Sequence, residues 1–152
     1  MIEFRLSTFR DCEELAPNMR QADVKEAKAS HGLDPLGALV TCLQNSKKPE
    51  TILVDGKIVG MCGVGHSGLV GYPWLLGSRG LVSNAKKLHS LVVPWLENYQ
   101  EQYKLLYNYV AVENQTSVRW LRQLGFVMIR LVPDHGVLRQ PFYEFVRIQK
   151  CV

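Results

Sequence analysis

Small and polar residues stand just before the longest helical pattern of the chain, and their types suit the binding of an anion. Gly77, Ser78, Gly80, Ser83 and Asn84 precede this pattern. Arg79, Lys86 and Lys87 add positive charge to the same stretch. The first N–H groups of a helix have no partner within the helix and carry a partial positive charge, so they bind phosphate groups well. The stretch predicts a phosphate-binding turn, and the structural alternative is a Ser-capped core helix after a flexible turn.

A second polar motif begins at Asn114. Asn114 is a typical N-cap, Val118, Leu121 and Leu124 then fall on one helical face, and Gly125 suits the left-handed turn that ends a helix. Asn114 and Ser117 are expected on the exposed side of this helix, either contacting a bound molecule or acting only as a cap and a solvated hydroxyl. Trp120 is expected in the core.

The first half of the chain must supply elements that position these motifs. Ile2 to Phe9 alternates apolar and polar residues and predicts a strand. Helical patterns follow, and the dipeptide Asp55-Gly56 then separates two β-branched runs, which is typical of a hairpin. The expected helices run from Arg10 to His31, interrupted by Pro17 and ended by Gly32, and from about Asp34 to about Asn45; the hairpin strands are Thr51 to Val54 and Lys57 to Val64.

The second half of the chain is expected to alternate strands and helices. Glycine-rich turns from Gly65 to Gly71 lead into a short strand, and the long amphipathic helix after it contains Pro94, which should kink or break it. The expected elements are a strand from Tyr72 to Leu76, a helix from about Ser83 to Tyr103, a strand from Leu105 to Val112, the short helix after Asn114, and strands from Phe126 to Val132 and Phe142 to Ile148.

This order of elements, with an Asn-capped helix and Leu124-Gly125-Phe126 near the C-terminus, resembles the GNAT superfamily of N-acetyltransferases over essentially the whole length. The resemblance implies an α/β fold with a mixed, mostly antiparallel central sheet flanked by helices, in a single domain over residues 1–152. It also implies acetyl-CoA as cofactor and direct acetyl transfer to a primary amine of an unknown acceptor, either a protein or a small molecule. In that family the capping Asn contacts the pantetheine arm of the cofactor.

The same resemblance assigns cofactor-binding residues. The family builds its pyrophosphate loop as Gln/Arg-x-x-Gly-x-Gly/Ala, and the corresponding positions here are Gly80, Ser83 and Ala85, of which only Ala85 conforms. The residues that the resemblance places at the cofactor are Leu75, Leu76, Gly77, Gly80, Ser83, Asn84, Ala85, Lys86, Asn114 and Ser117.

Catalytic residues are harder to assign. Acetyl transfer to an amine needs a base, and a tyrosine of the family protonates the leaving thiolate. That tyrosine's position is Leu121 here, and the strand from Tyr72 to Leu76 has no acidic residue. A thiol with a pKa of about 8.5 is already a fair leaving group, so the loss slows transfer without forbidding it. Glu113, Tyr109 and His66 are the substitutes, each with a structural role as the alternative.

Trp74-Leu75-Leu76 and the pattern Asn114-x-x-Ser117-x-Arg119-Trp120-Leu121 are similar to divergent GNAT-like proteins of tailed, podovirus-type bacteriophages. This similarity implies a second hypothesis: a protein of the same fold that has lost turnover and binds a host or virion protein.

Composition narrows the remaining classes. The net charge of +4 is modest and the basic residues are dispersed, which argues against a nucleic-acid surface. Neither a signal peptide nor a membrane span is expected, so we predict a cytoplasmic protein, in the host cytoplasm if a phage encodes it. Cys12, Cys42, Cys62 and Cys151 lack metal or redox spacing, so no metal site and no disulfide is predicted.

Overall fold

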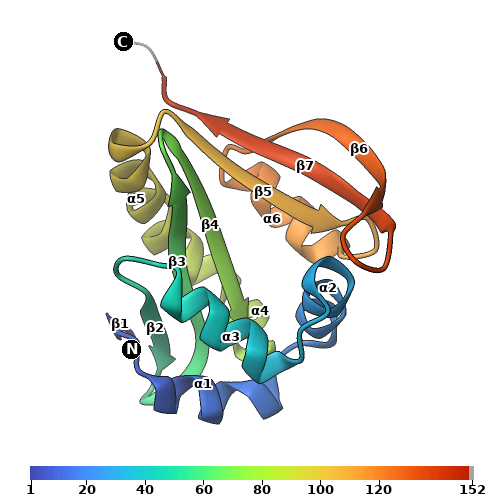
Figure 1. Ribbon diagram of the computed structural model, residues 1–152. Coiled ribbons are helices and arrows are strands. Elements are labelled where there is room, and N and C mark those ends of the chain that lie inside the picture. Colours follow the sequence, from blue (N-terminus) through green and yellow to red (C-terminus); the bar gives the residue numbers. More distant parts are fainter. Residues whose placement is uncertain (151–152) are drawn as a thin grey trace.

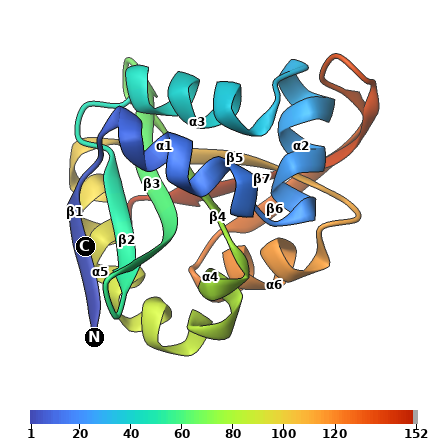
Figure 2. The same ribbon diagram turned by 90° about the horizontal axis from the view of Figure 1, so that it is seen from below.

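The computed structural model describes residues 1–150, which form one seven-stranded sheet with helices on both faces. The strand order is β1-β2-β3-β4-β5-β7-β6. Helices α1, α2 and α3 cover one face, and α4, α5 and α6 cover the other (Figure 2). The elements are β1 (Ile2–Leu6), α1 (Phe9–Leu15), a 3₁₀ turn (Ala16–Asn18), α2 (Gln21–His31), α3 (Pro35–Gln44), β2 (Glu50–Val54), β3 (Lys57–Ser67), β4 (Val70–Gly77), α4 (Arg79–Ser83), α5 (Ala85–Gln102), β5 (Leu105–Ala111), α6 (Gln115–Gln123), β6 (Val127–His135) and β7 (Gln140–Ile148).

The sheet is antiparallel except at its centre, which confirms the predicted fold class. Strands β4 and β5 are parallel and pair only at their first residues, Val70 with Leu105 and Gly71 with Leu106. Beyond these pairs the two strands diverge (Figure 1). The side-chain amide of Asn108 donates to the carbonyl oxygen of Pro73 across the opening, at 3.0 Å. The sheet therefore has a wedge-shaped opening at its centre.

The two hairpins of β2, β3 and β4 compare differently with the prediction. Asp55 and Gly56 turn with φ values of 49° and 78°, which confirms the predicted hairpin. The predicted glycine-rich turns over residues 65–71 are confirmed only at Gly68 and Leu69, where Gly68 has a φ of 58°, because β3 continues to Ser67 and β4 already begins at Val70. Gly71 serves close packing instead of a turn, since a Cβ there would lie 2.8 Å from side-chain atoms of Leu106 and Tyr103.

The N-terminal segment differs from the prediction in two respects. Strand β1 ends at Leu6 and not at Phe9, because Thr8 caps α1 in a capping box with Asp11. The helical region of residues 10–31 is two helices joined by the 3₁₀ turn that contains Pro17. The interruption at Pro17 and the end at Gly32, which has a φ of 68°, are confirmed.

The long helix begins two residues later than predicted and does not break. A separate short helix, α4, occupies residues 79–83, and Ser78 caps it by accepting a hydrogen bond from the N–H of Gly80 at 3.2 Å. Helix α5 runs from Ala85 to Gln102 without interruption at Pro94. Pro94 is exposed, so water can bind the carbonyl group that loses its helical partner.

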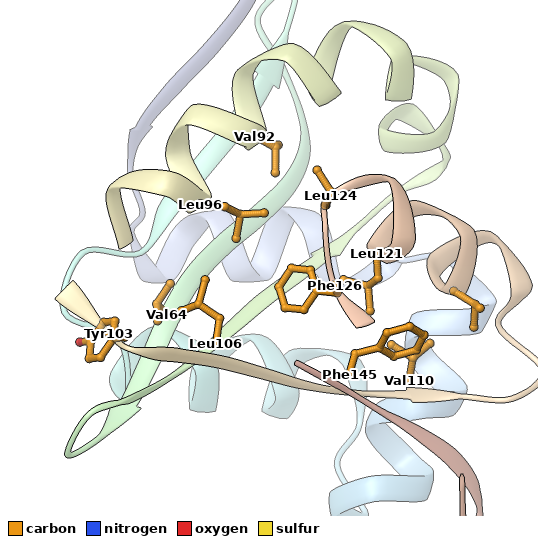
Figure 3. Close-up of a cluster of buried hydrophobic side chains, with 11 residues drawn as sticks. Val64, Val92, Leu96, Tyr103, Leu106, Val110, Leu121, Leu124, Phe126 and Phe145 are labelled. Atoms are coloured by element: carbon orange, nitrogen blue, oxygen red, sulfur yellow. The ribbon is translucent and has the colours of Figure 1, made fainter. Parts of the chain in front are cut away.

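The main core lies between the sheet and helices α5 and α6 (Figure 3). Leu121 belongs to this core and is only 9% exposed. Figure 3 shows it among the labelled core residues Val64, Val92, Leu96, Tyr103, Leu106, Val110, Leu124, Phe126 and Phe145.

Cys12, Cys42 and Cys62 are free thiols, and Cys151 lies outside the described residues. Within residues 1–150, no group of three metal-ligating side chains could hold a metal ion. No helix in this described range combines the length and apolar character needed to cross a membrane.

Candidate active site

A cleft of about 970 Å³ occupies the opening between β4 and β5 and reaches both faces of the sheet. On the face of α2 and α3 it is lined by Glu26, Thr41, Trp74 and Tyr109 among others, and toward α5 and α6 by residues that include Ala85, Ser117, Trp120 and Leu121. Leu75 and Leu76 of β4, which the family resemblance places at the cofactor, line it. The lining is mostly apolar, which is typical of a ligand site with a few placed polar groups.

Glu26 supplies a carboxyl group to this cleft. It lies on α2, and its Oε1 accepts hydrogen bonds from the N–H of Ala111 and the side-chain amide of Asn114, both at 2.9 Å. Burial raises the pKa of the Glu26 carboxyl to about 7, against the effect of these hydrogen bonds, which favour its charged form. The group therefore exchanges its proton near neutral pH, as a general base must.

Asp23, one helical turn before Glu26, has a structural role. It is 4% exposed, and its Oδ2 accepts a hydrogen bond from the N–H of Gly77 at 3.1 Å. Arg20 forms an ion pair with it at 3.6 Å and also donates its backbone N–H to the carbonyl of Gly77. Burial raises the pKa of the Asp23 carboxyl although Arg20 and the Gly77 N–H lower it. These contacts join α2 to the end of β4 and so hold Glu26 at the cleft.

Gly77 itself is buried at this junction and does not line the cleft. A Cβ added to it would lie 2.2 Å from a side-chain atom of Leu81 and 2.5 Å from the carbonyl oxygen of Val59. Its N–H is already bound to Asp23, so Gly77 permits the close packing of β4 on Leu81 and Val59 and has no N–H free for a cofactor.

Asn114 is confirmed as the cap of α6 but is not on an exposed side. It is 5% exposed, and its Oδ1 accepts hydrogen bonds from the N–H of Ser117 and from Arg20, both at 3.3 Å. Its amide group donates to Glu26. The prediction of an exposed Asn114 is wrong because both ends of the side chain are bound to α2. Ser117 is half-buried and lines the cleft.

Of the three predicted catalytic residues, only Tyr109 lines the cleft. Its hydroxyl donates to Glu144 at 2.9 Å. Glu144 is also bound by Arg130 at 2.6 and 3.0 Å, and this contact lowers the pKa of the Glu144 carboxyl to about 2. The Tyr109 hydroxyl thus donates its hydrogen bond to a carboxylate that stays ionised at neutral pH. Glu113 is exposed after β5, and His66 is exposed near Tyr103 at the end of β3, so the structure leaves both outside the cleft lining.

The predicted phosphate-binding turn is partly helical. Ser83 and Asn84 close the end of α4: the Ser83 hydroxyl donates to the carbonyl of Arg79, and both the N–H and the side-chain amide of Asn84 donate to the carbonyl of Gly80. In the described part of the chain no side chain caps α5, whose first residues are Ala85, Lys86 and Lys87. The N-terminus of α5 is therefore the part of this segment that keeps backbone donors for an anion.

Positive charge collects around that helix start. The sequence from Arg79 to Leu96 and the whole of α6 contain no acidic residue. The exposed cations on these elements are Arg79, Lys86, Lys87, Arg119 and Arg122. A phosphate-bearing ligand between α6 and the part of α5 up to Leu96 would meet cations and no carboxylate on these segments.

Trp120 adds an unsatisfied donor to the same region. It packs against the buried clusters, as expected, and it also lines the cleft and a shallow groove formed with Ala85, Lys86, His89 and Gln123. Its Nε1 is buried and has no hydrogen-bond partner among residues 1–150. An unpaired buried donor costs about 1–3 kcal/mol, which a ligand acceptor at the cleft would recover.

Glu26 was not among the site residues predicted from the sequence. A signal was present, since Arg20, Asp23 and Glu26 recur every three residues along a helix and so share one face. A polar row that faces the sheet is unusual, because such a face is normally apolar.

No family model matches the sequence, and no curated protein matches it. Solved structures do. Ard1 from Thermoplasma volcanium has a TM-score of 0.74 at 14% identity, covering 99% of each chain. A GNAT-family acetyltransferase from Bacillus anthracis has a TM-score of 0.72 at 13% identity, covering 97% of this chain and 95% of its own. Spermidine N-acetyltransferase from Vibrio cholerae, solved with CoA and spermine, has a TM-score of 0.67 at 11% identity, covering 97% of this chain and 95% of its own. At these identities the likeness establishes the fold, which is that of the GNAT acetyltransferases.

Proposed function

We propose that the protein is an acetyl-CoA-dependent N-acetyltransferase that acts on a primary amine by direct transfer. The observation that carries the proposal is the Glu26 carboxyl, half-buried in the opening of the sheet with a pKa of about 7. The general fold supports acetyl transfer, but activity depends on the site and not on the fold.

The residues of the cleft fit acetyl-CoA. The donors at the start of α5, with Lys86 and Lys87, suit the pyrophosphate, and the unpaired Nε1 of Trp120 suits a carbonyl of the pantetheine arm. Leu75, Leu76 and Ser117 line the path between them. When bound, acetyl-CoA would supply the acetyl group: a C–N bond to the amine forms, the C–S bond breaks, and coenzyme A leaves.

Glu26 prepares the amine for this transfer. An alkyl amine is protonated at neutral pH, and the carboxylate accepts a proton from it, so that the nitrogen has a free electron pair. Asn114 and the N–H of Ala111 hold the carboxyl in place through Oε1. The leaving thiolate receives its proton from solvent, because Leu121 is apolar and Tyr109 is bound to Glu144.

Calorimetric titration with acetyl-CoA tests the proposal. We expect binding in the micromolar range, and a thiol-release assay with amines should show turnover that Glu26→Gln lowers. Lack of binding at about millimolar acetyl-CoA, weaker than roughly 4 kcal/mol, would contradict the proposal.

Lack of binding would favour the second candidate: a protein of GNAT fold, related to those of podovirus-type phages, that has lost turnover and binds a host or virion protein. The observations that favour this candidate are the burial of Leu121 in the core and the helical form of the pyrophosphate turn, α4.

A further inference from the structure

We propose that the acceptor is a compact primary amine with a single positive charge on an apolar or aromatic body; this inference rests on the proposed function. Three features of the cleft on the side of α2 and α3 support it: an aromatic wall, a single free carboxyl group and a closed edge.

Aromatic rings from β4, β5 and β6 form the wall. Tyr72 and Tyr107 meet edge to face with ring centres 6.1 Å apart, Tyr107 and Tyr109 do the same at 5.2 Å, and His135 stacks on Tyr109 at 4.2 Å. All four line the cleft. Trp74 lines it as well, and its Nε1 is fixed by a hydrogen bond to the hydroxyl of Ser46 at 2.7 Å. Rings held by one another and by hydrogen bonds present a rigid apolar surface, which favours a flat apolar body.

Among the residues that line the cleft, one carboxyl group is not in an ion pair, that of Glu26. Asp23 and Glu26 are the acidic residues among those that line it. Asp23 is already paired with Arg20 and bound to the N–H of Gly77. Glu144, behind Tyr109, is neutralised by Arg130.

A second ammonium group would find no partner here. The basic groups of the lining on this side are Arg20, His31 and His135, none of which can pair with an ammonium group. Burying an unpaired ammonium is costly, so the lining disfavours polyamines.

One edge of the cleft is closed by backbone contacts. In the loop between β6 and β7, Val137 donates its N–H to the carbonyl of Ser30 at 3.3 Å, and Leu138 donates to that of Ala29 at 3.1 Å. Gly136 packs so closely that a Cβ there would lie 2.5 Å from the Ala29 carbonyl oxygen. Figure 2 shows this loop beside α2. An extended polypeptide cannot pass between these elements without breaking both hydrogen bonds, so the acceptor must be compact.

A panel of three amines tests the inference: 2-phenylethylamine, spermidine and the tripeptide Ala-Ala-Ala. Binding of coenzyme A is first measured by calorimetry without any amine, since its failure would refute the proposed function and not the amine class alone. The amines are then compared by thiol release with acetyl-CoA and by calorimetry on the coenzyme A complex. We expect 2-phenylethylamine to exceed the other two at least about tenfold in kcat/KM or affinity, the scale of a pocket built for apolar groups. A preference for spermidine or the tripeptide, or coenzyme A binding with no interaction with 2-phenylethylamine, would overturn the inference.

Two variants separate the aromatic wall from the charge argument. Tyr72 is 43% exposed, so Tyr72→Leu should fold, and it should raise KM for 2-phenylethylamine about 2- to 13-fold while leaving coenzyme A affinity unchanged. Phe9→Leu is the matched control, an aromatic residue 53% exposed outside the cleft, and it should change neither value. Thr41→Glu places a second carboxylate on the exposed side of the lining and should improve kcat/KM for spermidine several-fold relative to 2-phenylethylamine. An unchanged KM in Tyr72→Leu would contradict the role of the aromatic wall. An unchanged selectivity in Thr41→Glu would contradict the charge argument.

Discussion

Replacing Glu26 by Gln removes the ionisable group and keeps an oxygen that can accept the hydrogen bonds from Asn114 and Ala111. If Glu26 is the base, the rate above pH 7 should fall by about 10²- to 10⁴-fold. The ratio of wild-type to variant kcat/KM should rise with pH and level off above the pKa of about 7. The ionisation of the free amine affects both proteins equally and cancels in this ratio. Glu113→Gln, a change at an exposed carboxyl outside the cleft, is the matched control.

The same substitution makes a prediction for stability. Between the ordinary glutamate pKa of 4.5 and the folded value of about 7, the folded chain holds a proton that the unfolded chain has lost. The free energy of unfolding therefore decreases as pH rises through this window. A shift of this size corresponds to at most about 3 kcal/mol, and less after solvent screening of a carboxyl that remains partly exposed.

Urea unfolding at pH 5 and pH 8 measures this effect. Glu26→Gln has no carboxyl that must lose its proton in this window. The free energy of unfolding of the variant relative to wild type should therefore be higher at pH 8 than at pH 5. Asp23 also has a raised pKa and is present in both proteins, so the difference reports Glu26 together with its coulombic interaction with Asp23. A rate ratio that does not change with pH, together with a stability difference that is equal at pH 5 and pH 8, would refute the assignment of Glu26 as a buried base.

Three further substitutions test the rest of the site. Asn114→Ala removes the α6 cap, which costs about 1 kcal/mol, and it removes a hydrogen bond that favours ionised Glu26, so the midpoint of the pH–rate profile should move upward; an unchanged midpoint in a folded variant would leave Asn114 as a cap only. Leu121→Tyr puts a larger, polar side chain into the core, so a thermal melt should show destabilisation of about 1–3 kcal/mol; a variant as stable as the parent that binds acetyl-CoA but turns over no faster would show that position 121 does not face the sulfur. Lys86→Ala should weaken coenzyme A binding about two- to fivefold in calorimetry, the scale of an exposed ion pair, while Lys47→Ala in the loop before β2 should not; equal effects of the two changes would place the phosphates elsewhere.

The sequence alone predicted the structural features that depend on residues adjacent in the chain. Asp55-Gly56 predicts its hairpin because few dipeptides reach positive φ at both positions without strain. Asn114 and Gly125 mark the two ends of α6, since a cap needs a side-chain acceptor and the following turn, with a φ of 88° at Gly125, needs a residue without Cβ. The order of strands and helices, and with it the fold class, could be assembled from such local signals.

Local patterns failed where two of them competed. The alternation from Ile2 to Phe9 predicts one strand, but the capping box of Thr8 and Asp11 begins α1, so the strand ends at Leu6. The glycines from Gly65 to Gly71 predict turns, but only Gly68, with a φ of 58°, lies in one, and Gly71 is required by the Leu106 and Tyr103 side chains that pack on it.

The candidate site was decided by tertiary structure. Glu26 and Asn114 are far apart in the chain and meet only because α2 packs beside the end of β5. Whether a carboxyl acts as a base depends on its pKa, and the pKa of Glu26 is raised by burial among residues from several elements. Glu113 has the same functional group but stays exposed, and Tyr109 reaches the cleft with its hydroxyl already bound to Glu144. Residue type is local information, whereas desolvation and hydrogen-bond partners come from distant parts of the chain, so only the folded protein distinguishes these three side chains.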